Sequence, residues 1–243
     1  MLRGLHGEGV GGRGAGGGVC GVGGGWLGVV EGYGGRVGVE GELGTKVDGL
    51  AKVGSVQEEY IGDAAAAVTA LRALLELDPT NLDAVDFLSS LHQAGEQWEE
   101  LVEVLTRKLD LVDDAEERVE VLHMLGLTLQ LQIEDHGRAI DYLAQVLSVD
   151  EDHGGAVEAL QLYLLEDGDE RRRVAELLQP YYQRNENWPR LVQVQEILLE
   201  GEEEQGIRID LLRQLMNLHD ERLEQPSEAF DAGAELMRLD PVD

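Results

Sequence analysis

The sequence predicts an all-α protein made of successive helix hairpins. From about Thr45 onward, apolar residues recur at three- and four-residue spacing, which is the pattern of amphipathic helices. The sustained alternation of β-branched and polar residues that indicates strands is absent from the same stretch. Segments in the second half also repeat earlier segments at a constant offset. Together these observations predict stacked pairs of helices rather than a sheet or a single globular bundle.

Residues 1–45 form a glycine-rich, low-complexity segment that differs from the rest of the chain. Of the 32 glycines, 21 lie between Gly4 and Gly49. Each glycine raises the entropy cost of ordering and adds no side chain to a core, so we expect disorder there. The composition fits a flexible tail and a wrongly assigned start equally well. Residues 46–243 are predicted to contain the helical array.

Turn-forming residues divide the array into helices of about 12 to 18 residues. The first two helices are expected near residues 47–60 and 63–77, and about eleven are expected in all. The breaks are expected at residues 78–81, 94–95, 113–114, 135–137, 150–155, 167–168, 185–187, 201 and 225–226. Because these breaks are short, neighbouring helices should run antiparallel.

The internal repeat appears at two offsets. A shift of 90 residues superposes Trp98 on Trp188, Leu101 on Leu191, Val102 on Val192, Val104 on Val194, Arg118 on Arg208, Leu122 on Leu212, Leu125 on Leu215 and Ala139 on Ala229. A shift of 72 residues places Ala67 on Ala139 and Asp78 on Asp150. The two offsets are not multiples of one period, so the repeats differ in length.

The segment from Gly62 to Asn81 resembles the second helix of a tetratricopeptide repeat (TPR) and the turn that follows it. That family ends the helix with Leu-Asp-Pro, here residues 77–79, and places a small residue early in it. The small position is matched by Ala67, Ala139 and Ala229, and the family's leucine–glycine pair by Leu125 and Gly126. Gly233 departs from the pattern because that site is usually aromatic, and Glu151 replaces the terminal proline.

The resemblance covers about residues 47–243 and implies a right-handed α-solenoid of stacked antiparallel helix pairs with a concave groove. Asp240 and Pro241 match a repeat exit turn, and no polar capping helix follows them before Asp243. We therefore expect this chain to be a fragment of a longer array, truncated at its C-terminus.

Composition excludes several classes of partner. The formal net charge is −30, and residues 1–49 carry only 4 Lys and Arg against 5 Asp and Glu, so the array is the acidic part. Nucleic acids and anionic membranes are bound through Lys and Arg, and we expect neither as a partner. No apolar run approaches the roughly 20 residues of a membrane span. Cys20 has no partner for a disulfide, and glycine interrupts any signal peptide, so the expected location is the cytoplasm.

No motif predicts an enzyme, a cofactor or a metal site. The histidines form no HExxH arrangement. The acidic segment 150–155 begins like a calcium loop, but Gly154 and Gln161 stand where oxygen ligands belong. Since it aligns with residues 78–81, we interpret it as a turn between repeats. No serine, cysteine or lysine stands out as a nucleophile.

Two groups of residues are candidates for partner binding. Tyr163, Tyr181 and Tyr182 are the first group, because aromatic residues on a concave face frequently anchor a partner. The second is the basic cluster Arg171, Arg172 and Arg173, which could dock an acidic partner. The alternative for this cluster is ion pairing with Glu170, Glu176 or acids of a neighbouring repeat. Trp98 and Trp188 are expected to pack between repeats rather than to stack on a ligand.

The predicted function is a protein-interaction scaffold, not an enzyme. The resemblance implies that the groove binds a peptide or helix of another protein, and the acidity favours a basic or amphipathic partner. The alternative is a regulatory or structural segment of a larger multidomain enzyme or signalling protein. A helical-repeat hydrolase, a third possibility, requires desolvated carboxylates that face one another. Composition leaves the oligomeric state open.

Overall fold

The computed structural model describes residues 64–165 and 168–241, and in these ranges the chain is helical, with no strand. The chain divides into two units between Leu77 and Asp78. The first unit contributes one described helix, α3 (Ala64–Leu77), which matches the helix expected over residues 63–77. The glycine-rich segment, Cys20 and the helix expected over residues 47–60 lie outside the described residues.

The second unit contains nine α-helices within the described residues. They are α4 (Leu82–Ala94), α5 (Trp98–Leu111), α6 (Ala115–Thr128), α7 (His136–Val149), α8 (Gly154–Gln161), α9 (Asp169–Arg184), α10 (Trp188–Glu200), α11 (Gln205–Asn217) and α12 (Pro226–Leu239). Three shorter turns extend them: the π-helical turns η2 (Leu129–Ile133) and η4 (Leu218–Arg222), and the 3-10 turn η3 (Leu162–Leu164). Except where α8 gives way to η3, the turns between these helices overlap the predicted breaks. One length is wrong, because α8 has eight residues and gives way to η3.

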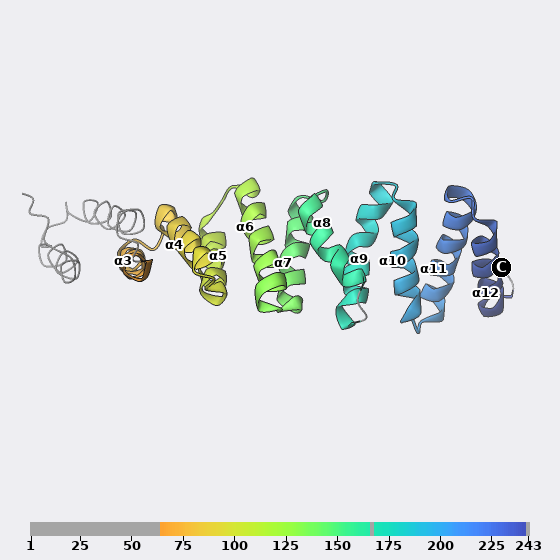
Figure 1. Ribbon diagram of the computed structural model, residues 1–243. Coiled ribbons are helices and arrows are strands. Elements are labelled where there is room, and N and C mark those ends of the chain that lie inside the picture. Colours follow the sequence, from red (N-terminus) through yellow and green to blue (C-terminus); the bar gives the residue numbers. More distant parts are fainter. Residues whose placement is uncertain (1–63, 166–167, 242–243) are drawn as a thin grey trace, which may run out of the picture. The chain divides into compact units, whose positions relative to one another are not determined.

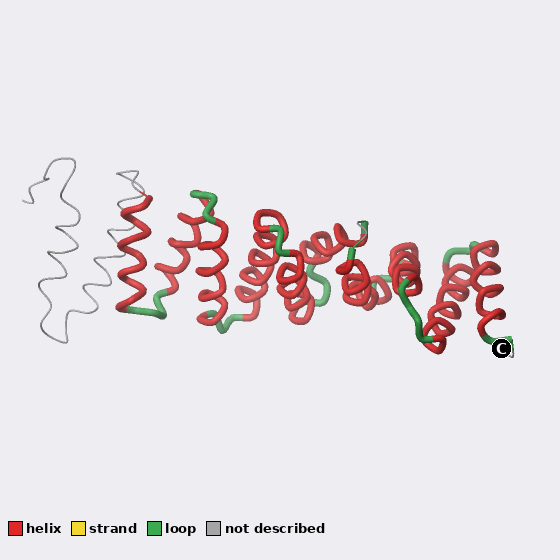
Figure 2. Tube along the Cα trace, turned by 90° about the horizontal axis from the view of Figure 1, so that it is seen from below, coloured by secondary structure: helices red, strands yellow, loops and turns green. Residues whose placement is uncertain are grey.

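The helices of the second unit pack in chain order. The most extensive contacts join α4 to α5, α6 to α7, α9 to α10 and α11 to α12, and further contacts join each of these pairs to the elements beside it. Figures 1 and 2 show these helices side by side in that order. Because a short turn joins the members of each pair, the members run antiparallel. The predicted architecture of stacked antiparallel helix pairs is therefore confirmed for this unit.

Both sequence offsets reappear in the turns. Glu96 (φ 54°) and Glu186 (φ 52°) adopt the left-handed conformation 90 residues apart, as do Glu134 (φ 61°) and Glu224 (φ 55°). Non-glycine residues rarely adopt this conformation, so its recurrence marks true structural equivalence.

The 72-residue offset relates the turns that precede α4 and α8. Asp78 Oδ1 accepts from the Thr80 amide at 3.2 Å, and Asp150 Oδ1 accepts from the Asp152 amide at 3.2 Å. Each turn ends in a helix N-cap. Asn81 Oδ1 accepts from the Ala84 amide, and the His153 side chain accepts from Ala156 in the same way. The acidic segment 150–155 is therefore a turn between repeats, as the sequence predicts.

The small-residue positions are buried. Ala67 and Ala139 are fully buried, and Ala229 is 8% exposed. Gly126 lets α6 approach α7, because a methyl group at this residue would lie 2.7 Å from Leu143 Cγ. The 90-residue shift carries this pair onto Met216 and Gly233, so the large and small partners are exchanged between the two hairpins.

Candidate protein-binding recesses

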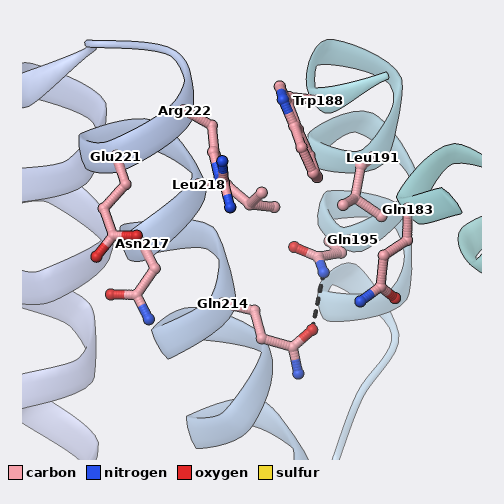
Figure 3. A pocket seen from close by; sticks show the side chains of 9 residues that line it. All are labelled: Gln183, Trp188, Leu191, Gln195, Gln214, Asn217, Leu218, Glu221 and Arg222. Atoms are coloured by element: carbon pink, nitrogen blue, oxygen red, sulfur yellow. Dashed lines mark hydrogen bonds between the residues drawn. The ribbon is translucent and has the colours of Figure 1, made fainter. Parts of the chain in front are cut away.

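An open recess of ≈ 370 Å³ lies between α10, α11 and η4 (Figure 3). We call it the Trp188 recess. Its lining residues are Gln183, Trp188, Leu191, Gln195, Gln214, Asn217, Leu218, Glu221 and Arg222. Amide side chains supply four of these nine residues, which sets the recess apart from the aliphatic core behind it.

The start of α10 fixes Trp188. The left-handed Glu186 turns the chain, Asn187 accepts a hydrogen bond from the Arg190 amide at 3.4 Å, and Pro189 occupies the first turn of the helix. Proline is favoured there because it lacks the amide hydrogen that such a position leaves unpaired. The Trp188 ring is half-buried and packs against a large cluster of buried residues that includes Ile140, Leu160 and Leu178, which we call the main core cluster. This packing confirms the expected role of the ring. The ring also lines the recess.

Arg222 covers part of the Trp188 ring. Its Cζ atom lies 4.9 Å from the ring centroid, a cation–π contact. The residue is exposed and forms no ion pair with any described residue, although the chain around it is acidic. In Figure 3 the Arg222 side chain extends from η4 on the side that faces Trp188. The recess thus offers a cation and an aromatic ring together.

Gln195 is the buried polar group of the recess. Its side chain is 3% exposed, and Nε2 donates to Gln214 Oε1 at 2.8 Å. Gln195 Oε1 is buried and has no hydrogen-bond partner among the described residues. In Figure 3 this oxygen faces the space between α10 and α11, towards Leu218. A buried acceptor without a donor costs about 1–3 kcal/mol, so a ligand that supplies a donor would gain affinity there.

A second recess, of ≈ 510 Å³, occupies the equivalent place around Trp98, and we call it the Trp98 recess. The 90-residue shift carries Gln183, Trp188, Leu191, Gln214, Asn217, Leu218, Glu221 and Arg222 onto Gln93, Trp98, Leu101, Met124, Leu127, Thr128, Leu131 and Gln132, which all line it. Glu120, His123 and His153 complete its lining. The internal repeat has therefore produced two recesses with the same framework.

The two recesses differ in chemistry. Met124, which is 41% exposed, and Leu131, which is 59% exposed, line the Trp98 recess where Gln214 and Glu221 line the Trp188 recess. The shift places Gln195 on Leu105, which is a buried residue of the smaller core cluster. Amides have thus replaced aliphatic side chains at equivalent positions of the Trp188 recess.

The structure corrects the expectation for two of the three candidate tyrosines. Tyr182 is fully buried and Tyr163 is 8% exposed, and both belong to the main core cluster. Burial raises the pKa of the Tyr182 hydroxyl. Apolar packing of the rings, rather than display to a partner, therefore explains their positions. Tyr181 is half-buried, with its ring 5.5 Å from that of Tyr182, and its role in binding stays a prediction.

The arginine cluster pairs within the chain. The partners are Glu200 for Arg171 at 3.0 Å, Glu176 and Glu202 for Arg172 at 3.3 and 2.7 Å, and Asp141 and Glu170 for Arg173. These contacts connect α9 with α10 and with α7, which confirms the intramolecular interpretation. Whether the cluster also takes part in partner binding stays a prediction.

The described residues contain neither a cluster that could hold a metal ion nor a buried carboxylate. No group of three His, Cys, Asp or Glu side chains among them is placed to hold a metal ion. Their buried polar side chains include no Asp or Glu, so nothing here supports the facing carboxylates of a hydrolase. None of the helices in these ranges is both long enough and apolar enough to span a bilayer.

Sequence reasoning missed the Trp188 recess, although one signal was available. The 90-residue shift that identifies the repeat also places Gln195 on Leu105 and Gln214 on Met124. A polar residue at a position where its equivalent belongs to a core is a mark of a functional site. Only coordinates show that the amide of Gln195 lacks a partner.

Comparison with known proteins gives weak likenesses. No family model matches the sequence, and no curated protein matches it. Among solved structures, the chain is similar to PilF of Pseudomonas aeruginosa, with 18% identity over 83% of this chain and 95% of that one, at a TM-score of 0.33. MamA is 15% identical over 78% of this chain and 95% of that one, at a TM-score of 0.36. YrrB, described as a TPR protein with an unusual peptide-binding site, is 14% identical over 79% of this chain and 86% of that one, at a TM-score of 0.35.

These likenesses are low, and the TPR-like fold of this chain follows from its own packing. Antiparallel helix pairs succeed one another, small residues stand where helices approach closely, and equivalent turns recur at the two offsets. The chain is a helical-repeat protein, and its open recesses are its candidate sites.

Proposed function

We propose that this chain is a protein-interaction scaffold that binds a peptide segment of a partner in the Trp188 recess. The observation that carries the proposal is the buried, unpartnered Oε1 of Gln195 at the floor of the recess. A peptide backbone carries one donor and one acceptor at each residue and suits a recess lined with amides. Trp188 provides a large surface for an apolar side chain beside it.

The free-energy cost of a buried, unpaired amide in the Trp188 recess supports a binding role. Replacing a buried aliphatic side chain, as at the position that Leu105 and Gln195 share, by an amide weakens a fold unless every polar atom is paired. The hairpin α5–α6 keeps Leu105 and Met124 at the same positions, so the framework does not require Gln195 and Gln214 there. A ligand whose amide hydrogens reach Gln195 would offset this cost.

The partner is proposed to be basic or amphipathic. The formal net charge of −30 attracts positive ligands over long distances and repels nucleic acids and anionic membranes. The proposed groove is acidic as a whole, with Arg222 as a local exception that stacks on Trp188. The proposed location is the cytoplasm, on the sequence grounds given above. The scaffold is proposed to have no catalytic activity of its own.

The test replaces two amides of the Trp188 recess by the residues that stand at the equivalent positions of α5 and α6. Peptides are first selected from a random displayed library on the wild-type chain, and the best one is titrated by calorimetry. The double variant Gln195→Leu, Gln214→Met should unfold at the same or a higher temperature and bind this peptide at least about tenfold more weakly.

The matched control is Met124→Gln, Leu131→Glu, which gives two positions of the Trp98 recess the residues found at the equivalent positions of the Trp188 recess, Gln214 and Glu221. It should leave the affinity of the selected peptide unchanged. Equal binding by the Gln195→Leu, Gln214→Met variant would exclude the Trp188 recess as the peptide site. A library that yields no binder to the wild-type chain would also count against the proposal.

A further inference from the structure

The outer side of α12 presents an apolar surface that the rest of the described chain leaves open. Phe230 is 74% exposed and Met237 is 67% exposed, on the same side of the helix as Gly233 and Ala234. We call these four residues the α12 face. They line a largely apolar recess of ≈ 550 Å³ between α11 and α12. Two large apolar side chains this exposed on one helix suggest an interaction surface.

The internal repeat shows what covers such a face. The 90-residue shift places Phe230 on Ile140 and Gly233 on Leu143, and both of these residues of α7 are fully buried. They share the main core cluster with residues of α8 and α9, and both of these helices contact α7. The residues of this cluster are Ala156, Val157, Ala159 and Leu160 on α8, and Val174, Ala175, Leu178 and Tyr182 on α9, so the spacing i, i+1 and i+4 is common to both helices. The occupant that this geometry accepts is therefore an amphipathic helix with apolar residues at i, i+1 and i+4.

Gly233 changes the requirement in one respect. Leu143 fills the equivalent position on α7, whereas Gly233 leaves room beside Met216, Phe230 and Met237. Met216 fills part of this volume, because its Sδ atom lies 3.3 Å from where a side chain on Gly233 would begin, and the occupant must fill the rest of the recess for the interface to be close-packed. A large apolar side chain on the docking helix, such as leucine or phenylalanine, meets this requirement.

Charge decides which occupant fits. On α7, Asp141 pairs with Arg173 of α9. Its equivalent on α12 is Asp231, which is exposed and forms no ion pair within the described ranges. The sequence of α12 carries three carboxylates and one arginine, and a second copy would bring the same charges and a formal −30 of its own. Like charges at an interface oppose association, whereas a basic helix would supply the counterpart of Arg173.

We propose that the α12 face binds a basic amphipathic helix of a partner protein, in the position that α8 and α9 occupy against α7. Its apolar residues cover Phe230 and Met237, and one of them enters the recess beside Gly233. An arginine or lysine of the helix pairs with Asp231. This surface shares only Asn217 with the Trp188 recess, and the variants that test the two proposals leave Asn217 unchanged, so each proposal can fail without the other.

The chain itself supplies the probe, a synthetic peptide of residues 170–184 from α9, which contains Arg173 and carries four arginines against two glutamates. The full chain is studied by hydrogen exchange with and without this peptide. The amides of α12 should exchange faster than those of α7 in the chain alone and become protected when peptide is added. Phe230→Lys and Asp231→Lys should each weaken this protection at least about tenfold in peptide concentration. Circular dichroism checks that both variants remain helical.

Controls separate this occupant from the others. Leu131→Lys places the same charge on an exposed leucine of the Trp98 recess and should leave the protection of α12 unchanged. Protection that survives Phe230→Lys would overturn the proposal. So would α12 amides that are already protected in the chain alone, or a dimer in sedimentation analysis that Phe230→Lys dissociates, since either result would mean that another occupant covers the face.

Discussion

Arg118 and Arg208, which are 90 residues apart, make the same pair of hydrogen bonds to the backbone. Arg118 Nη1 donates to the carbonyl oxygens of Leu109 at 2.7 Å and Val112 at 3.1 Å. Arg208 Nη1 donates to those of Leu199 and Glu202, both at 3.1 Å. In each case the guanidinium joins the C-terminal end of one helix to the start of the next, where carbonyls lack a partner within their helix.

This shared geometry predicts similar losses for the same substitution. Arg118→Lys and Arg208→Lys should each lower the free energy of unfolding by about 1–2 kcal/mol, because a lysine amine cannot reproduce the geometry of a guanidinium group. Urea denaturation followed by circular dichroism measures the change. The control is Arg138→Lys, whose exposed pair with Asp135 at 3.6 Å contributes little. A loss at only one of the two sites would contradict the equivalence.

The close approach of α6 and α7 predicts opposite outcomes for one substitution at two glycines. Gly126→Ala should cost about 1–3 kcal/mol, because its methyl group would lie 2.7 Å from the buried Leu143. Gly233→Ala should be neutral or stabilising by up to about 1 kcal/mol. Its nearest neighbour is the flexible Met216 side chain, with Sδ at 3.3 Å, and alanine favours a helix. Thermal unfolding of both variants decides the point, and equal effects would be the contrary result.

His123 predicts a dependence of stability on pH. Burial, and then the charge of His153 beside it, lower the pKa of His123 below its usual value of 6.5. The rings lie 4.7 Å apart, and Glu120 lines the same recess. Because the unfolded chain takes up the proton more readily, this contribution to stability is complete above pH 6.5 and is lost as the pH falls through the lower folded pKa.

Comparing the wild-type protein with a His123 variant separates the contribution of His123 to the pH dependence from that of the many carboxylates. His123→Gln should reduce the fall in the free energy of unfolding between about pH 7.5 and 5.5, as measured by urea denaturation. His136→Gln is the control at an exposed histidine. Parallel curves for wild type and His123→Gln would show that His123 makes no such contribution.

Replacing a glutamate that has a left-handed backbone conformation by glycine should stabilise the protein. Glu186→Gly and Glu96→Gly should each raise the free energy of unfolding by about 0.5–1 kcal/mol, because glycine adopts a positive φ without steric strain. Glu196→Gly, inside α10, should instead cost about 1 kcal/mol. Melting temperatures of the three variants compare the two environments. A loss at both left-handed positions would refute the prediction.

The sequence predicted the hairpins well because the signal is local and periodic. Leu101, Leu105 and Leu109 mark a buried side by spacing alone, and turn residues such as Asn81 and Asp114 mark helix starts by their capping chemistry. The pairing of the arginine cluster was also predictable, since carboxylates outnumber arginines and lysines around it.

The sites were less predictable because they depend on which atoms remain unpaired. Tyr182 appeared suitable for a surface on composition, yet its position on α9 directs it into the core. The role of Gln195 depends on one oxygen without a donor, which no pattern of residue types can show. The same holds for Phe230, because its exposure becomes informative only beside the buried Ile140.

In the α6–α7 pair the small residue, Gly126, lies on the first helix and faces Leu143, whereas in the α11–α12 pair the large residue, Met216, lies on the first helix and faces Gly233. This difference limits how such a chain can be rearranged. Moving α7 alone to the place of α12 would set Leu143 against Met216, and the reverse transfer would leave a hole at Gly126. Only whole hairpins can be shuffled without loss of fit. The unit that duplication or protein engineering can copy in this molecule is therefore the helix pair, together with its internal size complementarity.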